Sequence, residues 1–486
     1  MTPLNWTPVD TGLPDSLAPR IEPTSLPQTR LLAWSDEAAA LIGLDAEDRS
    51  NASLLDTLAG NAVPPGARPT ATAYGGHQFG QWAGRLGDGR ALTLGRLDGP
   101  QGSWDVQLKG AGPTPYSRGG DGRAVLRSSI REYLCSEAMH ALGIPTTRAL
   151  AIVGSPQSVR RETMETTAVV TRLAPSFTRF GHFEWLSHLD DIEGLRGLAV
   201  HVIAKHFPDL VGNTTGWLTE VVQRTARLMA QWQSVGFCHG VMNTDNFSIL
   251  GLTLDYGPYG FIDGFNANHI CNHTDQGGRY AYARQPQVGQ WNCAQLLNAC
   301  LPLLDTNSEA AVEKGTAILD AYGQAYAAES VRLWRLKLGL ASAHDDDPAL
   351  VNRWLTFLHR SHADFTLSFR RLATVDSHSE APDAGRDHHV DPAGYDVWIT
   401  DYRARLRAEH SDEAARAIAM NAVNPLYVLR NHLAQQVIAQ AEAGAPEGID
   451  ALRRVLTQPF TEQPGAEVYA AEPPPELRHI EVSCSS

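Results

Sequence analysis

The residues with the clearest chemical potential lie in one stretch, "HGVMNTDNFSILGLTLDYGPYGFID", residues 239–263. Asn246 and Asp255 offer an amide and a carboxylate oxygen, which are hard ligands of the kind that Mg²⁺ prefers. The segment between them, "FSILGLTL", is predicted to form a tight hairpin that brings the two side chains together. Asp245, next to Asn246, is the only acid beside position 241, where a base is missing. The alternative is an Asx-rich turn that binds nothing.

The spacing in this stretch is that of a protein-kinase catalytic loop, in which an Asn follows the His by seven residues and an Asp-Phe-Gly comes later. His239 and Asn246 keep that offset, and Asp255-Tyr256-Gly257 stands where Asp-Phe-Gly is expected. The position of the catalytic base holds Val241, which cannot accept a proton. The stretch therefore predicts either an inactive kinase-like protein or a kinase-like site with different chemistry.

Two further features are typical of a phosphate site. The glycines of "GRLGDGR", residues 84–90, would let backbone N–H groups approach a phosphate closely. Lys109 ends the strand-like "WDVQLKG", and Glu132 lies 23 residues further on in a helical segment. Alternatively, residues 84–90 only connect two strands of a hairpin, Lys109 is a surface lysine and Glu132 is a solvated glutamate. In the presence of the stretch 239–263, we favour a Lys109–Glu132 ion pair.

Three charged residues nearby have both a structural and a functional interpretation. Asp121, in "GDGRAVLR", is placed as the N-cap of the helix that contains Glu132, or its carboxylate and the Gly122 backbone meet a nucleotide. Arg172 and Arg179 lie where a β-rich region gives way to a helical one. Arginine binds phosphate as a rigid fork, but salt bridges are the simpler explanation.

The elements that must position these residues follow from the patterning. Strands are expected at about 90–97, 104–109, 148–154 and 167–173, with one helix between the pairs that carries an apolar stripe from Leu126 to Leu142. This order is that of a kinase small lobe. Further helices are expected at 35–44 and 217–237, and near 287–304, 308–338, 347–372, 394–408 and 424–443.

These elements predict an α+β protein with a kinase-like bilobal fold. We expect an N-terminal wrap (1–65), a β-rich N-lobe (66–180), a mainly helical C-lobe (181–375) and a helical extension (376–486) that ends in a Cys-Ser-Ser tail.

Composition narrows the class of protein. The 486 residues carry a net charge of −14, which argues against nucleic acid as the main partner. No apolar run approaches the roughly 20 residues that cross a bilayer, and no leader is visible, so we expect a cytoplasmic protein without membrane contact. The six cysteines form no Cys-x-x-Cys pair. A zinc site at His269, Cys271 and His273 is the weaker interpretation of "NHICNHTDQGG".

The longer motifs resemble the selenoprotein O family, also called YdiU or protein adenylyltransferases. The similarity covers nearly the whole chain and includes "YGGHQFGQWAGRLGDGRA", "QLKGAGPTPYSRGGDGRAVLRSSIREYLCSEAMHALGIPTTRAL", "VVTRLAPSFTRFGHFE", the stretch 239–263 and the terminal "CSS". The resemblance implies a kinase-like fold that binds ATP in a flipped orientation. AMP, rather than phosphate, would then be transferred to Ser, Thr or Tyr hydroxyls of proteins. The change at Val241 would mark altered chemistry, not loss of activity.

The resemblance also implies residue roles, carried over position by position. Asp245 would be the proton acceptor, Glu132 would pair with Lys109, and Asn246 and Asp255 would hold Mg²⁺. Residues implied to contact ATP are Gly87, Gly89, Arg90, Lys109, Asp121, Gly122, Arg172, Arg179 and Asp255. Cys484 replaces the selenocysteine of some members, and Cys271 is implied as its partner in a regulatory disulfide.

Three other functions remain open from the sequence: a phosphotransferase that moves the γ-phosphoryl group, a non-catalytic pseudokinase scaffold, and UMP transfer with Mn²⁺ in place of Mg²⁺. We expect a monomer whose protein targets, and preference among Ser, Thr and Tyr, the sequence does not name.

Overall fold

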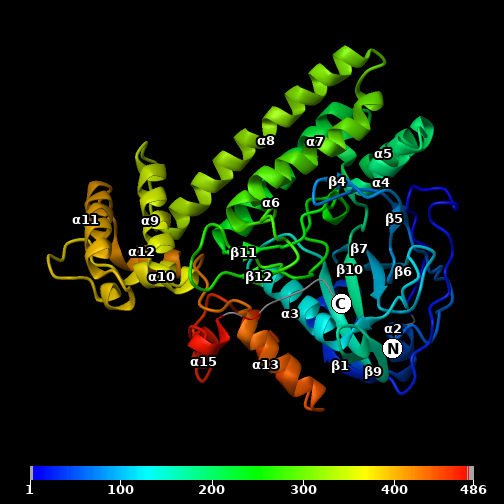
Figure 1. The fold of residues 1–486 in the computed structure, drawn as a ribbon, viewed down its shortest axis with the longest axis horizontal. Coiled ribbons are helices and arrows are strands. Elements are labelled where there is room, and N and C mark those ends of the chain that lie inside the picture. Colours follow the sequence, from blue (N-terminus) through cyan, green and yellow to red (C-terminus); the bar gives the residue numbers. More distant parts are fainter. Residues whose placement is uncertain (1–3, 479, 481–486) are drawn as a thin grey trace.

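The computed structural model describes residues 4–478 and residue 480, and is a mixed α/β structure (Figure 1). The strands are β1 Arg30–Trp34, β2 Ala73–Tyr74, β3 His77–Gln78, β4 Gln81–Trp82, β5 Leu86–Gly87, β6 Ala91–Gly99, β7 Gly102–Lys109, β8 Ala124–Val125, β9 Arg148–Arg160, β10 Met164–Ala174, β11 Phe237–Cys238 and β12 Gly260–Phe261. The α-helices are α1 Asp36–Leu41, α2 Ala52–Leu58, α3 Leu126–Ala141, α4 Phe180–His188, α5 Ile192–His206, α6 Thr214–Ser234, α7 Gln285–Leu304, α8 Ser308–Lys337, α9 Asp347–Ser361, α10 Phe365–Arg371, α11 Pro392–Ala408, α12 Glu413–Asn421, α13 Asn431–Glu442, α14 Glu447–Leu456 and α15 Glu467–Ala470.

The main sheet is antiparallel, with the order β1-β9-β10-β7-β6, and β8 pairs with β10 beside this path. The four strands expected from the sequence are confirmed as β6, β7, β9 and β10. In the register of β7 and β10, Lys109 lies opposite Val170 and Gln107 lies opposite Arg172. Because side chains alternate along a strand, Gln107, Lys109 and Arg172 all point to the same face of the sheet.

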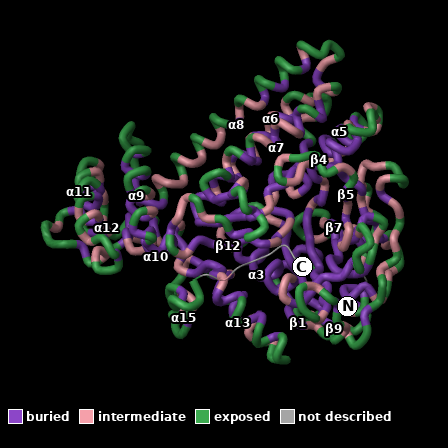
Figure 2. Tube along the Cα trace, in the orientation of Figure 1, coloured by how far each residue is buried: buried purple, intermediate pink, exposed green. Residues whose placement is uncertain are grey.

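The two faces of this sheet have different covers, as Figures 1 and 2 show. The face of Lys109 packs on α3, where Ile130 and Leu134 share one buried cluster with Ile152 and Val170 of the sheet. That cluster continues into the helical part of the chain through α6 and α7. The opposite face is covered by the N-terminal region, which also supplies the edge strand β1. The sheet is thereby a buried platform for charged side chains on its α3 face.

Several helix boundaries differ from the sequence expectation. The helix expected over 347–372 is two helices, α9 and α10, because His362 adopts a left-handed conformation (φ 48°) and Asp364 caps the second one. The helix expected near 424–443 begins only at Asn431, and α12 and α14 were not anticipated. α6, α7, α8 and α11 lie close to their expected bounds.

The N-cap predicted at Asp121 is wrong. Helix α3 begins at Leu126, with Val125 at its N-cap and no side-chain cap. Residues 124–125 instead form β8 and pair with β10, which delays the start of the helix. The Asp121 carboxylate is thereby free for other partners, described below.

No helix within the part of the chain that the structure describes is long and apolar enough to cross a membrane. The kinase-like bilobal arrangement and the four-part division of the chain stay predictions.

Candidate active site

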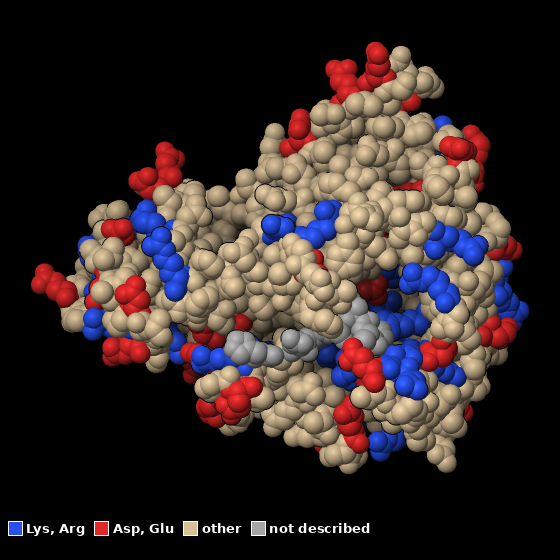
Figure 3. Space-filling model, in the orientation of Figure 1, with Lys and Arg blue, Asp and Glu red and all other residues tan. Residues whose placement is uncertain are grey.

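A cavity of about 880 Å³ opens on the α3 face of the sheet, next to the stretch 239–258. Eight Lys or Arg and four Asp residues line it, an excess of positive charge in a chain whose net charge is −14. Figure 3 shows basic side chains around a hollow where Figure 1 places β6, β7 and β10. Predicted site residues that line this cavity are Gly87, Gly89, Arg90, Lys109, Asp121, Gly122, Arg172, Arg179, Asp245, Asn246 and Asp255.

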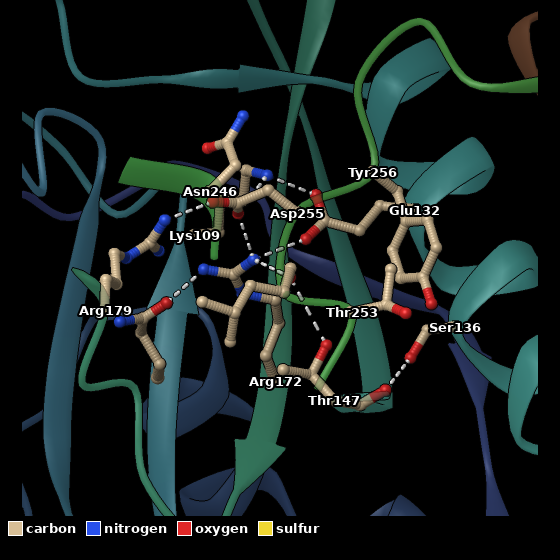
Figure 4. A network of polar contacts seen from close by, with 12 residues as sticks. Lys109, Glu132, Ser136, Thr147, Arg172, Arg179, Asn246, Thr253, Asp255 and Tyr256 are labelled. Carbon is tan, nitrogen blue, oxygen red and sulfur yellow. Dashed lines mark hydrogen bonds and ion pairs between the residues drawn. The ribbon is translucent and has the colours of Figure 1, made fainter. Parts of the chain in front are cut away.

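Asp255 is the centre of the charge network in Figure 4. Its Oδ1 lies 2.5 Å from Nη1 of Arg172 and 3.4 Å from Nζ of Lys109, and its Oδ2 lies 2.6 Å from Nη1 of Arg179. Burial alone would raise the pKa of Asp255, but the three cations outweigh it and hold the pKa well below its usual range. Asp255 is therefore ionised throughout the neutral range.

Lys109 and Glu132 form the ion pair that the sequence predicted, with 2.5 Å between Nζ and Oε2. The other oxygen of Glu132 lies 2.8 Å from Nη1 of Arg172, so one glutamate of α3 orients two cations of the sheet. Gln107, opposite Arg172 in the register, accepts a further hydrogen bond from its guanidinium. Burial lowers the pKa of Lys109, and the charges of Glu132 and Asp255 oppose that change.

The glycine-rich turn before β6 is shaped by close contacts. A Cβ on Gly87 would lie 2.4 Å from the Tyr116 ring, and one on Gly89 would lie 2.8 Å from the Tyr116 carbonyl oxygen. Arg90 follows directly and lines the cavity. Among the described residues, its side chain has neither an ion-pair nor a hydrogen-bond partner. This leaves one guanidinium of the cavity wall available to a ligand.

Asp121 forms a two-point ion pair with Arg161, with 2.8 Å for each of the two contacts. It also accepts a hydrogen bond from the Arg123 N–H. Gly122 follows at φ +65°, and a Cβ there would lie 2.1 Å from the carbonyl oxygen of Gly112. Only glycine fits that position without moving backbone, so the wall of the cavity is held close at this point.

Asp245 lies in the short 3₁₀ helix Thr244–Asn246 and is buried. Its Oδ2 accepts a 3.4 Å hydrogen bond from Nε2 of Gln78, while its Oδ1 is buried without a partner among the described residues. Burial raises the pKa of Asp245 to about 7, although Arg179 opposes the change. A carboxyl group with that pKa can take up a proton near neutral pH.

Asn246 and Asp255 reach the cavity from the two sides of a tight turn. The predicted hairpin is confirmed as an antiparallel bridge between Phe247 and Thr253. The Asn246 amide nitrogen donates to the Val241 carbonyl oxygen over 2.9 Å, which leaves the amide oxygen as the acceptor. The two oxygen donors that the sequence indicated therefore line the same cavity.

One element of the site had no role assigned from the sequence. β3 and β4, in "YGGHQFGQW", reach the stretch 239–263: the N–H of His77 donates to the Thr244 hydroxyl over 2.7 Å. A Cβ on Gly76 would lie 2.9 Å from that hydroxyl. Two consecutive glycines before a short polar segment were the available signal for such a close approach.

Only one of the two cysteines of the predicted disulfide lies among the described residues. Cys271 is buried, and its thiol donates toward the Cys238 carbonyl oxygen over 3.3 Å. Cys484 lies outside the described residues. Zinc finds no support, because the described residues contain no group of three or more His, Cys, Asp or Glu side chains placed to hold a metal.

Comparison with known proteins agrees with these motifs. The family model described as "Protein adenylyltransferase SelO" matches residues 1–456. The protein nucleotidyltransferase YdiU of Cupriavidus pinatubonensis is 53% identical over 480 residues, covering 96% of this chain and 92% of that protein. Those of Methylococcus capsulatus and Burkholderia multivorans are 53% and 52% identical, covering 95% and 98% of this chain and 93% and 94% of the relatives. The chain therefore belongs to the SelO protein adenylyltransferase family, a family of nucleotidyltransferases.

Proposed function

We propose that this chain transfers AMP from ATP to hydroxyl groups of Ser, Thr or Tyr residues in proteins. Family membership supports nucleotidyl transfer. The observation that carries the residue assignments is the convergence of Lys109, Arg172 and Arg179 on Asp255, beside a buried Asp245 with a pKa near 7. A kinase would carry its base at position 241, where this chain has valine.

The polyphosphate of ATP belongs among the cations of the cavity. Among the described residues, Arg90 has no ion-pair or side-chain hydrogen-bond partner there. The glycines at 87, 89 and 122 line the cavity, and their close contacts with Tyr116 and Gly112 hold backbone at its wall. Asp255 neutralises Arg172 and Arg179 in the structure. We infer that the phosphates replace Asp255 as partner of these arginines and so release its carboxylate.

The released carboxylate and the amide oxygen of Asn246 fit a Mg²⁺ ion. Mg²⁺ commonly takes one or two protein oxygens and completes its shell with phosphate oxygens and water. When bound, the ion would neutralise charge on the phosphates. Mn²⁺ could use the same oxygens.

In the transfer itself, the acceptor oxygen attacks the α-phosphorus, and its proton passes to Asp245. The bond from the α-phosphorus to the bridging oxygen breaks, and pyrophosphate leaves with the electron pair. Lys109, Arg172 and Arg179 stabilise the charge that develops on the leaving group. Glu132 keeps Lys109 and Arg172 in place. Because positioning and charge stabilisation dominate, we expect the loss of Asp255 to reduce the rate more than the loss of Asp245.

We further infer that the chain has the kinase-like bilobal fold, with an N-terminal wrap (1–65), an N-lobe (66–180), a C-lobe (181–375) and a helical extension (376–486). The antiparallel sheet with α3 on one face, followed by a helical region, supports this division.

The test uses ATP labelled at the α- or the γ-phosphate, with Mg²⁺ and dephosphorylated casein as acceptor. We expect α-label alone to survive denaturation of the acceptor. Asp255→Asn, which keeps the shape of the side chain, should abolish the transfer while ATP still binds to the freed arginines. Asp245→Asn should retain a measurable rate.

Transfer of γ-label alone would establish a phosphotransferase instead. Absence of any label together with absent ATP binding would favour a scaffold. A parallel reaction with α-labelled UTP and Mn²⁺ separates UMP transfer from AMP transfer.

A further inference from the structure

The β3–β4 hairpin, residues 77–82, lies against the catalytic stretch and is firmly anchored there. Besides the bond from His77 to Thr244, Nδ1 of His77 lies 2.7 Å from Oε1 of Glu184. The N–H of Phe79 donates to the Tyr280 hydroxyl over 2.8 Å. The hairpin is therefore fixed to the residues around Asp245 and is part of the same site.

The two sides of the hairpin face different surroundings. Gln78 lines the cavity and donates to Asp245. Its neighbours at the tip and on β4 face outward: the exposed fractions of Phe79 and Trp82 are 40% and 37%, high values for aromatic side chains. An aromatic surface thus begins one residue away from the partner of the proposed proton acceptor.

The turn places a bulky residue, Phe79, in a backbone conformation that such residues rarely adopt. Gln78 pairs with Gln81, so Phe79 and Gly80 are the two loop residues, and both have positive φ, at 50° and 81°. Such turns favour Asn-Gly, because a bulky side chain in the left-handed region is strained. The ring of Phe79 packs on Tyr280, with 5.1 Å between centroids, yet stays partly exposed. Strain of this kind persists only where the surroundings hold it, and here the contacts with Tyr280 do so.

A cation without an acidic partner adjoins the hairpin tip. The Arg279 guanidinium lies 4.7 Å from the centre of the Trp291 ring and close under Gly80, where a Cβ would lie 2.7 Å from Cζ. Among the described residues, it forms no ion pair. Phe79, Trp82 and Arg279, named here the hairpin platform, therefore place two partly exposed aromatic rings and one positive charge around the hairpin.

We propose that the hairpin platform binds the acceptor protein through an extended segment in which the modified hydroxyl residue is flanked by apolar and acidic side chains. This rests on the proposed function, because the acceptor oxygen must then reach Asp245. Gln78 ties Asp245 to the hairpin, so a segment that delivers its hydroxyl to Asp245 lies next to the hairpin, and its flanking residues extend toward Phe79 and Trp82. Apolar side chains match the rings, and an acidic one matches Arg279. Gln78 is a positioning residue in this arrangement.

The experiment measures transfer of α-label from ATP by the full chain to synthetic peptides with a central Ser-Thr-Tyr block. One peptide has Leu, Phe and Glu flanks, a second has Lys in place of Glu, and a third has Gly flanks. We expect the first peptide to have a KM at least about tenfold below that of the third.

Four variants and a control test the platform. Phe79→Asn supplies the residue that the turn prefers, so the fold is retained while the ring is lost. It and Trp82→Ala should each raise the KM of the first peptide about fivefold or more, with kcat and the KM of ATP little changed. Arg279→Glu should shift preference to the Lys peptide, and Arg279→Gln should remove the distinction between the two. Val397→Ala, exposed on α11, is the matched control and should change nothing.

Unchanged peptide KM values in Phe79→Asn and Trp82→Ala would overturn the platform, as would equal labelling of all three peptides. A joint fall of kcat and ATP affinity would also overturn it, since the hairpin would then only support the catalytic stretch. Labelled casein with no labelled peptide would exclude a short segment as the occupant. If the wild-type chain labels neither casein nor peptide, the proposed function itself fails.

Discussion

Two aspartates ten positions apart in the chain have opposite electrostatic environments. Asp255 is surrounded by Lys109, Arg172 and Arg179, which keep it ionised in spite of burial. Asp245 is buried with one weak side-chain donor, so its pKa rises to about 7. Two carboxyl groups whose environments separate their pKa values are the usual sign of divided roles. Here the ionised Asp255 is suited to binding cations, and Asp245 is suited to taking up a proton.

The first prediction concerns Asp245→Asn. The pKa of Asp245 is raised from 3.8 to about 7 in the folded state. At pH values where the unfolded chain ionises this residue, the raised pKa therefore lowers the stability of the wild-type fold. This loss of unfolding free energy is absent below about pH 4, grows between pH 4 and 7, and is constant above pH 7, with an upper limit of about 4 kcal/mol. Asp245→Asn should therefore raise the free energy of unfolding at pH 8 but not at pH 4.

The same variant should lose activity, by about 10²-fold at pH 8. The wild-type rate should rise with pH through about 7, as Asp245 loses its proton, and the rise should be missing in Asp245→Asn. Denaturant unfolding at the two pH values and a pH–rate profile check both statements. A variant with the wild-type profile would assign the proton transfer to another group.

At the scale of elements, the cavity depends on short segments that approach each other closely. The glycine-rich turn, the segment 120–123 and the β3–β4 hairpin each bring backbone near a neighbour at a glycine. The regular elements position the charged side chains. β7 and β10 place Gln107, Lys109 and Arg172 on one face of the sheet, and α3 brings Glu132 to them. The loops then determine how closely the walls of the cavity can approach a ligand.

The second prediction compares Gly122→Ala with Gly143→Ala. Both glycines have positive φ, at 65° and 77°, but only at Gly122 would a Cβ meet backbone, since nothing lies within 4 Å of it at Gly143. Gly143→Ala should cost about 1–2 kcal/mol of stability from its conformation alone. Gly122→Ala should cost clearly more and should weaken ATP binding as well. Thermal unfolding with and without ATP measures both effects. Equal losses in the two variants would show that the segment 120–123 tolerates displacement.

At the scale of the whole molecule, the cavity joins parts of the chain that are far apart in sequence. Arg131 of α3 donates to the Tyr259 carbonyl oxygen over 2.6 Å and to Asn431 of α13 over 3.2 Å. This contact fixes the sheet side of the cavity to the stretch 239–263 and to the C-terminal helices. A positive cavity inside an acidic protein concentrates the field where an anion binds and leaves the outer surface negative.

The third prediction concerns the two ends of the implied disulfide. After oxidation with diamide, mass spectrometry of a non-reduced digest should find a peptide that joins the segments of Cys271 and Cys484, and Cys484→Ser should abolish it. Burial raises the pKa of the Cys271 thiol well above its usual value, so the reaction should be slow near pH 7 and faster at higher pH. Oxidation that links Cys271 to Cys238 instead, and leaves Cys484 free, would contradict this pairing.

Much of the site could be predicted from the sequence because its residues occur in patterns that are local. Alternation and helical periodicity located β6, β7, β9, β10 and α3, and the offset from His239 to Asn246 drew attention to the stretch 239–263. Family motifs then supplied the arginines and glycines that single spacings did not specify. All of these residues line one cavity.

What the sequence alone could not provide depends on contacts across long separations. Asp121 is a good N-cap by type, but pairing of β8 with β10 removed it from the start of α3. The pKa of Asp245 depends on its burial, and the hairpin reaches it only because a glycine permits contact with Thr244. The sequence by itself determined the four main strands and helix α3, the charged residues and the family. Only the tertiary structure decided which charges neutralise each other, which carboxyl group has a raised pKa and which aromatic rings remain exposed near it, because burial and distance exist only once the chain is folded.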